Sequence, residues 1–194
     1  MIETPPIKVF DDFICPQYQD YLLNYFIYHI RYVYTQNIDY GPDQYDIDIK
    51  GNDKTAFVYC SLNAFNKDPV NGTFQQDAQV LNLLLPMVYT GINVYKPGID
   101  IKQLIRLRTV LYTKGQYEGC GVPHRDMYTP HYTMIYYAND SDGPTCFFDK
   151  NMEVFKEVHP KKGRAVIFPG TTYHGGYAPK EYDNRILLNA NFMI

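Results

Sequence analysis

Cysteine is scarce in this chain, and its positions give no sign of the common thiol-based metal sites. The four cysteines stand at positions 15, 60, 120 and 146, and no two of them form a C-x-x-C pair. Because zinc knuckles need closely spaced pairs of this kind, none is predicted. We expect four reduced thiols in a cytoplasmic protein, since the opening residues MIETPPIKVFDDF lack the basic start and apolar run of a secretory signal.

Long apolar runs and a strong net charge are also missing. No segment holds the roughly 18 apolar residues needed to cross a bilayer, so no membrane span is expected. The formal net charge of -3 gives no general reason to expect nucleic acid as a partner. Residues 1–100 carry 6 Lys and Arg against 12 Asp and Glu, whereas residues 101–194 carry 12 against 9. The basic half could favour a small dianion, or the two halves could simply have differently solvated surfaces.

The chain does have the length and apolar content of one globular domain. It has 194 residues, of which 45% are apolar and 20% charged. In its first half, aromatic spacing predicts a helix over 15–34, with His29 as a packed helix residue and a buried face. Tyr21, Tyr25, Tyr28 and Tyr32 fall on one side, with Leu22, Phe26 and His29 beside them. A second helix is predicted over 73–95, bent or divided by Pro86, and the acidic segment 35–55 is predicted to be a long loop, which would be a functional lid or disordered.

After residue 98 the sequence changes to short runs rich in β-forming residues. The predicted strands are 102–113, 132–138, 144–149, 153–158, 164–168 and 184–193, and a further strand is expected within 56–65. Helices followed by strands indicate an α+β chain whose helices pack on a mostly antiparallel sheet or barrel. We therefore expect a single domain over 1–194, with helical support and the lid loop in 1–100 and the β-barrel core in 101–194.

Two of the predicted strands have one apolar face and one mixed face. In NRILLNANF, Arg185, Leu187, Asn189 and Asn191 share one side, whereas the intervening residues are apolar. In QLIRLRTVLY, the mixed side carries Arg106 and Arg108 together with Tyr112. We expect helices to cover the apolar faces and the mixed faces to line a polar cavity, although an ordinary solvated face would give the same alternation.

The segment VPHRDMYT places His124 and Asp126 two residues apart. In an extended segment, residues i and i+2 project to the same side, roughly 7 Å apart, so an imidazole and a carboxylate can reach one ion. Further along, GRAVIFPGTTYHGG places His174 at the end of an apolar strand, between glycines that allow close approach. Two histidines and one carboxylate form the facial triad of non-haem Fe(II) oxygenases, and zinc could use the same residues with a water molecule.

Arg185 favours iron over zinc at this site. It lies eleven residues after His174 on the mixed face of the last strand, where a guanidinium can bind a carboxylate through two parallel hydrogen bonds. A dicarboxylate co-substrate could chelate the metal at one end and meet Arg185 at the other. A zinc hydrolase has no general need for this arginine.

From about residue 104 to its end, the sequence resembles the catalytic core of 2-oxoglutarate/Fe(II)-dependent dioxygenases, specifically their prolyl 4-hydroxylase-like branch. The matching stretches, in order, are RTVLYTKGQY, PHRD, TMIYYANDSDGPTCFF, VHPKKGRAVIFPG, YHGG and NRILLNANF. The resemblance implies a double-stranded β-helix, a jelly-roll or cupin-like barrel, with supporting N-terminal helices. One departure is DGPT, where many relatives have two glycines before the threonine and this chain has Gly143 and Pro144.

The resemblance also implies the roles of particular residues. His124, Asp126 and His174 would bind Fe(II), and Arg185 would bind the distal carboxylate of 2-oxoglutarate. Tyr137 matches a tyrosine that assists that carboxylate, although it could equally fill the barrel. Tyr112 matches an aromatic or polar position at the same pocket.

Outside these matches the sequence leaves several residues open. We expect His131 to lie on a loop rather than on the metal, and His159 to be a turn residue. Arg106 and Arg108 could contact substrate or pair with local carboxylates.

The implied activity is hydroxylation that depends on 2-oxoglutarate, O2 and Fe(II), with ascorbate as an optional addition. The branch suggests a prolyl residue in a peptide or protein as the substrate. Hydroxylation of a free amino acid or other small metabolite stays open as an alternative, and so does a non-catalytic cupin-like binding module. The expected partner is thus a peptide or a small molecule.

Overall fold

The computed structural model describes residues 7–35, 56–67, 74–116, 118–127 and 129–194, without the side chains of 63–67 and 74–76. The predicted lid loop over 35–55 lies outside these residues, apart from Thr35. The two helices of the described part are α1 (Pro16–Tyr28) and α2 (Ala78–Tyr95). Its strands are β1 (Lys8–Phe10), β2 (Val33–Thr35), β3 (Ala56–Lys67), β4 (Phe74–Gln76), β5 (Gln103–Thr113), β6 (Tyr132–Tyr137), β7 (Thr145–Phe148), β8 (Val154–Val158), β9 (Ala165–Pro169), β10 (His174–Gly176) and β11 (Asn184–Met193).

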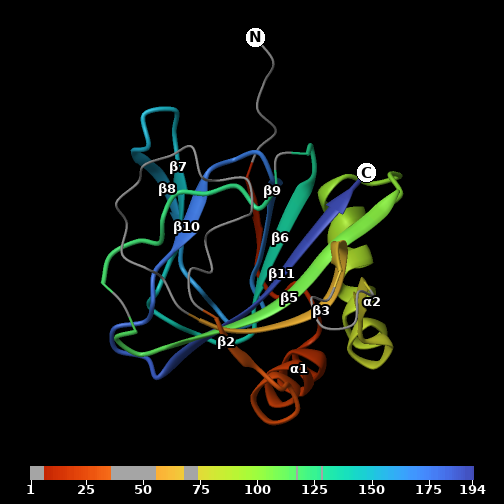
Figure 1. The fold of residues 1–194 in the computed structure, drawn as a ribbon, viewed down its shortest axis with the longest axis horizontal. Coiled ribbons are helices and arrows are strands. Elements are labelled where there is room, and N and C mark those ends of the chain that lie inside the picture. Colours follow the sequence, from red (N-terminus) through yellow and green to blue (C-terminus); the bar gives the residue numbers. More distant parts are fainter. Residues whose placement is uncertain (1–6, 36–55, 68–73, 117, 128) are drawn as a thin grey trace.

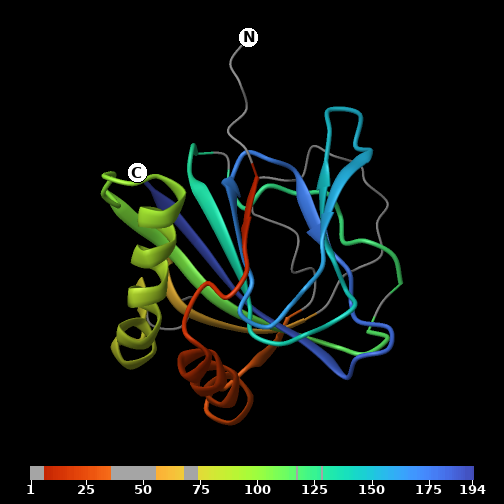
Figure 2. The same ribbon diagram turned by 180° about the vertical axis from the view of Figure 1, so that it is seen from behind.

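The strands form two antiparallel sheets with both helices on one side. The large sheet has the order β1-β9-β6-β11-β5-β3-β2, with β4 paired to β3, and the small sheet has the order β10-β7-β8. The two sheets lie opposite each other, and α1 and α2 pack against the outer face of the large sheet (Figures 1 and 2). This arrangement confirms the predicted α+β class and all the strands predicted after residue 98. The first half of the chain supplies strands to the large sheet as well as helices.

The first helix is shorter than its predicted range of 15–34. It ends at Tyr28, and the residues Val33–Thr35 form an edge strand that pairs with β3. His29 is the C-cap residue, and its backbone N–H donates to the carbonyl of Tyr25. Its side chain is exposed, so the prediction of a packed histidine was wrong.

The buried face of α1 contains some of the predicted residues and not others. Leu22 and Phe26 are fully buried, and Tyr25 and Tyr32 pack against the same core, whereas Tyr21 is 55% and Tyr28 is 73% exposed. A helix that covers one side of a sheet needs only one apolar stripe. The side chains without a hydroxyl take the centre of that stripe, and Tyr21 and Tyr28 turn towards water.

The second helix begins later than predicted because its first residues belong to a strand. Phe74–Gln76 pair with β3, and α2 starts after Asp77, whose carboxylate accepts hydrogen bonds from the backbone N–H groups of Gln79 (3.0 Å) and Val80 (3.1 Å). Pro86 lies within α2 without ending it. Within the described ranges, no helix combines the length and apolarity needed to cross a membrane.

Asp77→Ala is expected to lower the free energy of unfolding by about 1 kcal/mol, because two N–H groups at the start of α2 lose their acceptor. The hydroxyl of Tyr59 also donates to this carboxylate and, as the largest contribution, lowers the pKa of Asp77. A carboxyl group with a lowered pKa stabilises the fold above its unfolded pKa, about 4, and this stabilisation is lost as the pH falls through the folded pKa. Urea unfolding at pH 7 and pH 3 should show the difference from wild type at pH 7 and a smaller one at pH 3. Asp77→Asn, which keeps a capping oxygen, is the control; equal stabilities of Asp77→Ala and wild type at pH 7 would contradict this role.

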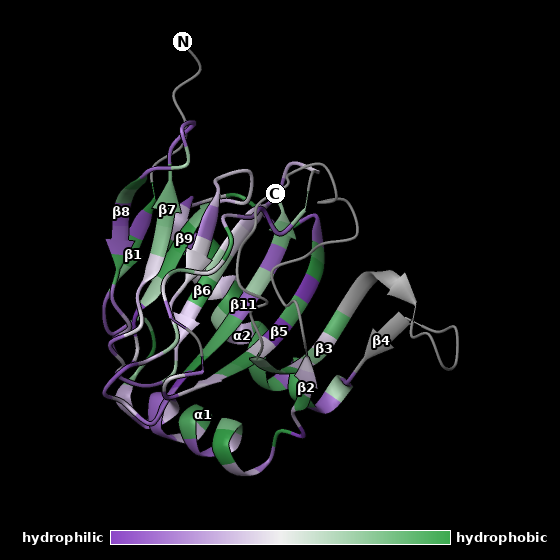
Figure 3. Cartoon of the chain, turned by 60° about the vertical axis from the view of Figure 1, so that its left-hand side comes forward, coloured by the Kyte–Doolittle hydropathy of each residue, from purple (hydrophilic) through white to green (hydrophobic). Residues whose placement is uncertain are grey.

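The large sheet separates two cores, as the alternating faces predicted. The helix-side core contains the apolar face of β11, which is Ile186, Leu188, Ala190 and Phe192. The barrel-side core contains Val110 and Tyr112 from β5 and Leu187 from β11. Hydrophobic and hydrophilic residues alternate along β5 and β11 (Figure 3). The polar members of the mixed faces therefore point between the two sheets.

Candidate metal centre and anion pocket

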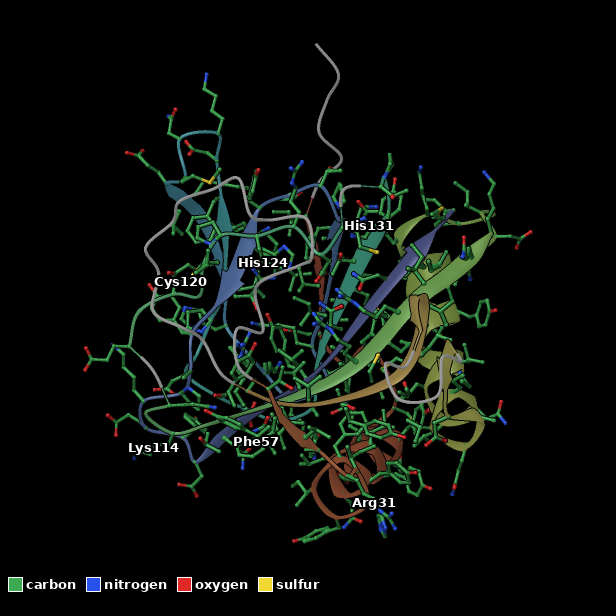
Figure 4. All side chains as sticks on the ribbon, in the orientation of Figure 1. Arg31, Phe57, Lys114, Cys120, His124 and His131 are labelled. Carbon is green, nitrogen blue, oxygen red and sulfur yellow. The ribbon has the colours of Figure 1, made fainter. Side chains whose placement is uncertain are left out.

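His124 and Asp126 lie on the segment between β5 and β6, and this segment is held against β10. The backbone N–H of His124 donates to the carbonyl of His174, and the N–H of His174 donates back, both at 2.9 Å. Figure 4 shows His124 beside β10. The two imidazole centroids are 4.6 Å apart, and one candidate ligand atom from each of His124, Asp126 and His174 lies within 4.8 Å of the others. The structure thus brings together the three residues that the sequence singled out.

Both histidines are oriented by their Nδ1 atoms. Nδ1 of His124 lies 2.9 Å from the carbonyl oxygen of Val122, and Nδ1 of His174 lies 3.1 Å from that of Thr172. When Nδ1 donates to a carbonyl, Nε2 carries the lone pair that can bind a metal. Burial, with a smaller contribution from His124, lowers the pKa of His174 to about 4, so this ring is neutral at physiological pH.

Asp126 accepts hydrogen bonds from three strands. Its Oδ1 accepts from Nη2 of Arg106 (2.6 Å) and of Arg108 (3.3 Å), both on β5. Its Oδ2 accepts from three further side chains on β6 and β11, namely Thr133 (3.3 Å), Asn189 (3.2 Å) and Asn191 (2.8 Å). Burial by itself would raise the pKa of Asp126, but the nearby charges, that of Arg106 foremost, hold it well below its ordinary value. The carboxylate is therefore ionised and fixed in position.

Arg185 lies further along the same barrel face and is only 2% exposed. Its Nη2 donates to Oγ1 of Thr145 (2.7 Å), and the hydroxyl of Tyr137 donates to the same oxygen (2.7 Å). The guanidinium carbon lies 5.2 Å from the ring centroid of Tyr112 and 5.7 Å from that of Tyr137. Nε of Arg185 is buried without a hydrogen-bond partner, and no carboxylate in the described part of the chain forms an ion pair with this side chain. A buried guanidinium in this state is suited to bind an anion.

One pocket connects the histidines to Arg185. Its wall includes Gly176, where a Cβ atom would lie 2.6 Å from Nη1 of Arg185. A side chain at this position would therefore displace the guanidinium. The lining residues are Arg108, Val110, Tyr112, His124, Ile135, Thr145, His174, Gly175, Gly176, Arg185, Leu187 and Asn189.

The other residues that the sequence left open lie outside this group of three. His131 is buried just before β6, outside any helix or strand, and its Nδ1 lies 2.7 Å from the carbonyl oxygen of Thr129. His159 follows β8, with its side chain 64% exposed. Arg106 and Arg108 pair with a carboxylate, which was one of the two alternatives. Their partner, Asp126, could not be found from spacing alone because the contact joins a strand of the barrel, β5, to a loop about 20 residues further along the chain.

Comparison with known proteins shows which family carries such a site. Residues 109–193 match the family model described as the 2OG-Fe(II) oxygenase superfamily. The match covers 85 of the 194 residues, so it shows a region similar to this superfamily. The matched region holds His124, Asp126, His174 and Arg185 and stops short of Arg106 and Arg108. Among curated proteins, none matches the chain significantly.

Solved structures confirm the predicted double-stranded β-helix fold of this chain. A Pseudomonas putida prolyl-4-hydroxylase is 12% identical with a TM-score of 0.55, over 98% of this chain and 92% of that one. A Trichoplax adhaerens prolyl hydroxylase, solved with a hypoxia inducible factor oxygen degradation domain peptide fragment, is 11% identical with a TM-score of 0.62, over 99% and 85%. SnoN, a non-heme alpha ketoglutarate dependent epimerase from nogalamycin biosynthesis, is 14% identical with a TM-score of 0.62, over 96% and 77%. At sequence identities this low, the similarity supports a shared fold only.

The residues of this site fit both Fe(II) and 2-oxoglutarate. Two imidazoles and one ionised carboxylate are the donor set that suits non-haem Fe(II). The Arg185 guanidinium, which has no ion-pair partner in the described part of the chain, fits the distal carboxylate of a small diacid. Thr145 was not predicted as a site residue, although it follows directly on the DGP turn and its hydroxyl contacts Arg185.

Proposed function

We propose that the protein is a 2-oxoglutarate- and O2-dependent Fe(II) hydroxylase in which His124, Asp126 and His174 hold the iron. The observation that carries the proposal is the position of Arg185, a buried cation in the same pocket as both histidines that has no carboxylate partner among the described residues. A diacid that chelates the metal at one end would supply this missing partner at the other.

The residues of the pocket would each do a separate part of the work. Bound iron, together with 2-oxoglutarate and dioxygen, supplies the oxidising power needed to hydroxylate an unactivated C–H bond. Arg185 would fix the distal carboxylate of 2-oxoglutarate, and Thr145 and Tyr137 would hold the guanidinium in place. The rings of Phe147 and Phe168 pack against His174, with centroids 6.5 and 5.0 Å away, and would exclude water from that side of the metal.

The substrate has two candidates. The likeness of the fold to prolyl hydroxylases, one of them solved with a peptide fragment, supports a prolyl residue in a peptide or protein. The likeness to SnoN, together with the arginines inside the barrel, supports a free amino acid or other small metabolite. The contacts of Arg108 and Asn189 favour a substrate with a free carboxylate, which is a free amino acid or the C-terminal residue of a peptide.

Anaerobic titration of the protein with Fe(II) and 2-oxoglutarate tests the proposed site. A weak visible absorption band should appear on chelation, and oxygen should then yield succinate. His174→Ala should weaken iron binding by more than about 100-fold and remove the band, because one of three ligands is gone. His159→Ala, which changes an exposed histidine elsewhere, is the matched control and should behave as wild type. A band of full intensity in His174→Ala would contradict the assignment.

A further inference from the structure

The pocket also contains a pair of polar atoms without partners, at some distance from Arg185. Nε of Arg108 and Oδ1 of Asn189 are both buried, and neither makes a hydrogen bond within the described part of the chain. The two residues are direct neighbours across β5 and β11, and both line the pocket. One atom is a donor and the other an acceptor. An unpaired buried polar group lowers the free energy of unfolding by about 1–3 kcal/mol, so two such groups side by side indicate a functional role.

Contacts with Asp126 fix the orientation of both side chains. Nδ2 of Asn189 donates to Oδ2 of Asp126 at 3.2 Å, so its Oδ1 points elsewhere. Nη2 of Arg108 donates to Oδ1 of Asp126 at 3.3 Å, while its Nε stays unpaired. Each residue thus uses one group to hold the proposed iron ligand and leaves a second group for another molecule.

The local charge favours an anion at this place. Arg106 and Arg108 share the single carboxylate of Asp126, and no other carboxylate of the described chain forms an ion pair with either of them. A divalent ion on Asp126 would increase the excess of positive charge. A negative group would therefore be stabilised beside Arg108.

This place is separate from the site proposed for the distal carboxylate of 2-oxoglutarate. Arg185 pairs with Tyr112 across β11 and β5, and Arg108 lies four residues before Tyr112. At about 3.3 Å per residue, the two arginines are attached roughly 13 Å apart along the sheet. A distal carboxylate bound at Arg185 therefore does not serve as the partner of Arg108.

We infer that Arg108 and Asn189 form a substrate subsite for a free carboxylate with a neighbouring N–H donor. Arg108 would bind the carboxylate, and Oδ1 of Asn189 would accept from the adjacent nitrogen. This is the chemistry of an α-amino acid or of the C-terminal residue of a peptide. The inference rests on the proposed function, and within it the subsite excludes a residue in the interior of a peptide, because such a residue has no free carboxylate.

Calorimetric binding to the anaerobic Fe(II) form, saturated with 2-oxoglutarate, tests the subsite without turnover. The probes are the twenty standard amino acids, each as the free acid, as the N-acetyl acid and as the N-acetyl amide. At least one free acid should bind ten-fold or more tightly than its N-acetyl amide. Equal binding of the free acid and the N-acetyl acid would indicate a peptide C-terminus as the source, whereas a ten-fold preference for the free acid would indicate a free amino acid.

Arg108→Met and Arg106→Met form a matched pair of variants. Both lose a hydrogen bond to Asp126, but Nε of Arg106 already donates to Asn191 (2.9 Å), so only Arg108 offers an unpaired donor. Arg108→Met should weaken the acid probe at least ten-fold and leave the amide unchanged. Arg106→Met should keep the preference for the acid.

Two outcomes would overturn the subsite. One is that no acid binds better than its amide in wild type, and the other is that Arg108→Met and Arg106→Met lose the preference equally. The visible band of the Fe(II) and 2-oxoglutarate form is recorded in the same samples. Its absence in wild type would refute the proposed function itself, whereas a normal band without preference for acids refutes the subsite alone.

Discussion

Asp126→Ala is expected to lower the free energy of unfolding of the metal-free protein by about 3 kcal/mol and to abolish iron binding. The carboxylate is the only one paired with Arg106 and Arg108 in the described chain, and it also accepts from Asn191 and two other side chains. Its removal leaves two largely buried cations facing each other, and several hydrogen-bond donors lose their acceptor. Breaking a buried ion pair on one side typically costs about 3–5 kcal/mol, and the partial exposure of these arginines places the value at the lower end.

The stabilisation by Asp126 should depend on pH in a defined direction. Because the pKa of Asp126 is held well below its ordinary value, its stabilisation is fully present above about pH 4 and is lost only as the pH falls through the folded pKa. The difference between Asp126→Ala and wild type should therefore persist from pH 8 down to about pH 4. Urea unfolding in the presence of a chelator measures it without any contribution from bound metal.

His124→Ala separates the two effects of the aspartate. It removes a proposed iron ligand but no partner of Arg106 or Arg108, so iron binding should be lost with a much smaller loss of stability. The role of Asp126 in the fold would be refuted if the two alanine variants unfolded at the same urea concentration.

Much of the fold could be predicted from alternation along the chain. In β11 the apolar face from Ile186 to Phe192 covers the helix-side core, and its period of two placed Arg185 and Asn189 on the opposite side. The tyrosines of α1 misled the prediction because periodicity shows which residues share a side but not which side a sheet covers. Three-residue strands such as β1 and β10 carry too few residues for any period to be recognised.

The candidate site was predictable by residue type, whereas its surroundings were not. Four residues stand out because burying their polar or charged side chains without a function costs free energy. They are His124, Asp126, His174 and Arg185. The partners of Asp126 come from β5, β6 and β11, which are distant in sequence and are brought together only by the register of the sheet. No spacing rule links them, so the double role of Arg108 emerges only from the structure.

Arg185→Met is expected to weaken 2-oxoglutarate binding by at least about 100-fold without destabilising the protein in the absence of ligand. Two charge-assisted hydrogen bonds to a carboxylate, each worth about 1.5–3 kcal/mol, would be lost on binding. In the ligand-free protein, however, the guanidinium is 2% exposed with an unpaired Nε. Methionine has a similar length and no charge to desolvate, so the free energy of unfolding should stay the same or rise.

Thermal unfolding over a series of 2-oxoglutarate concentrations measures both effects at once. Wild type should gain stability as the ligand concentration passes its dissociation constant, because only the folded state binds. Arg185→Met should start at an equal or higher midpoint and show no gain over the same range. Tyr137→Phe serves as the graded control, since it removes one hydrogen bond to Thr145 but keeps the cation, and its loss of affinity should be about ten-fold. If Arg185→Met were instead strongly destabilised without ligand, the arginine would be a structural residue that is already satisfied, and the case for a diacid bound beside it would fail.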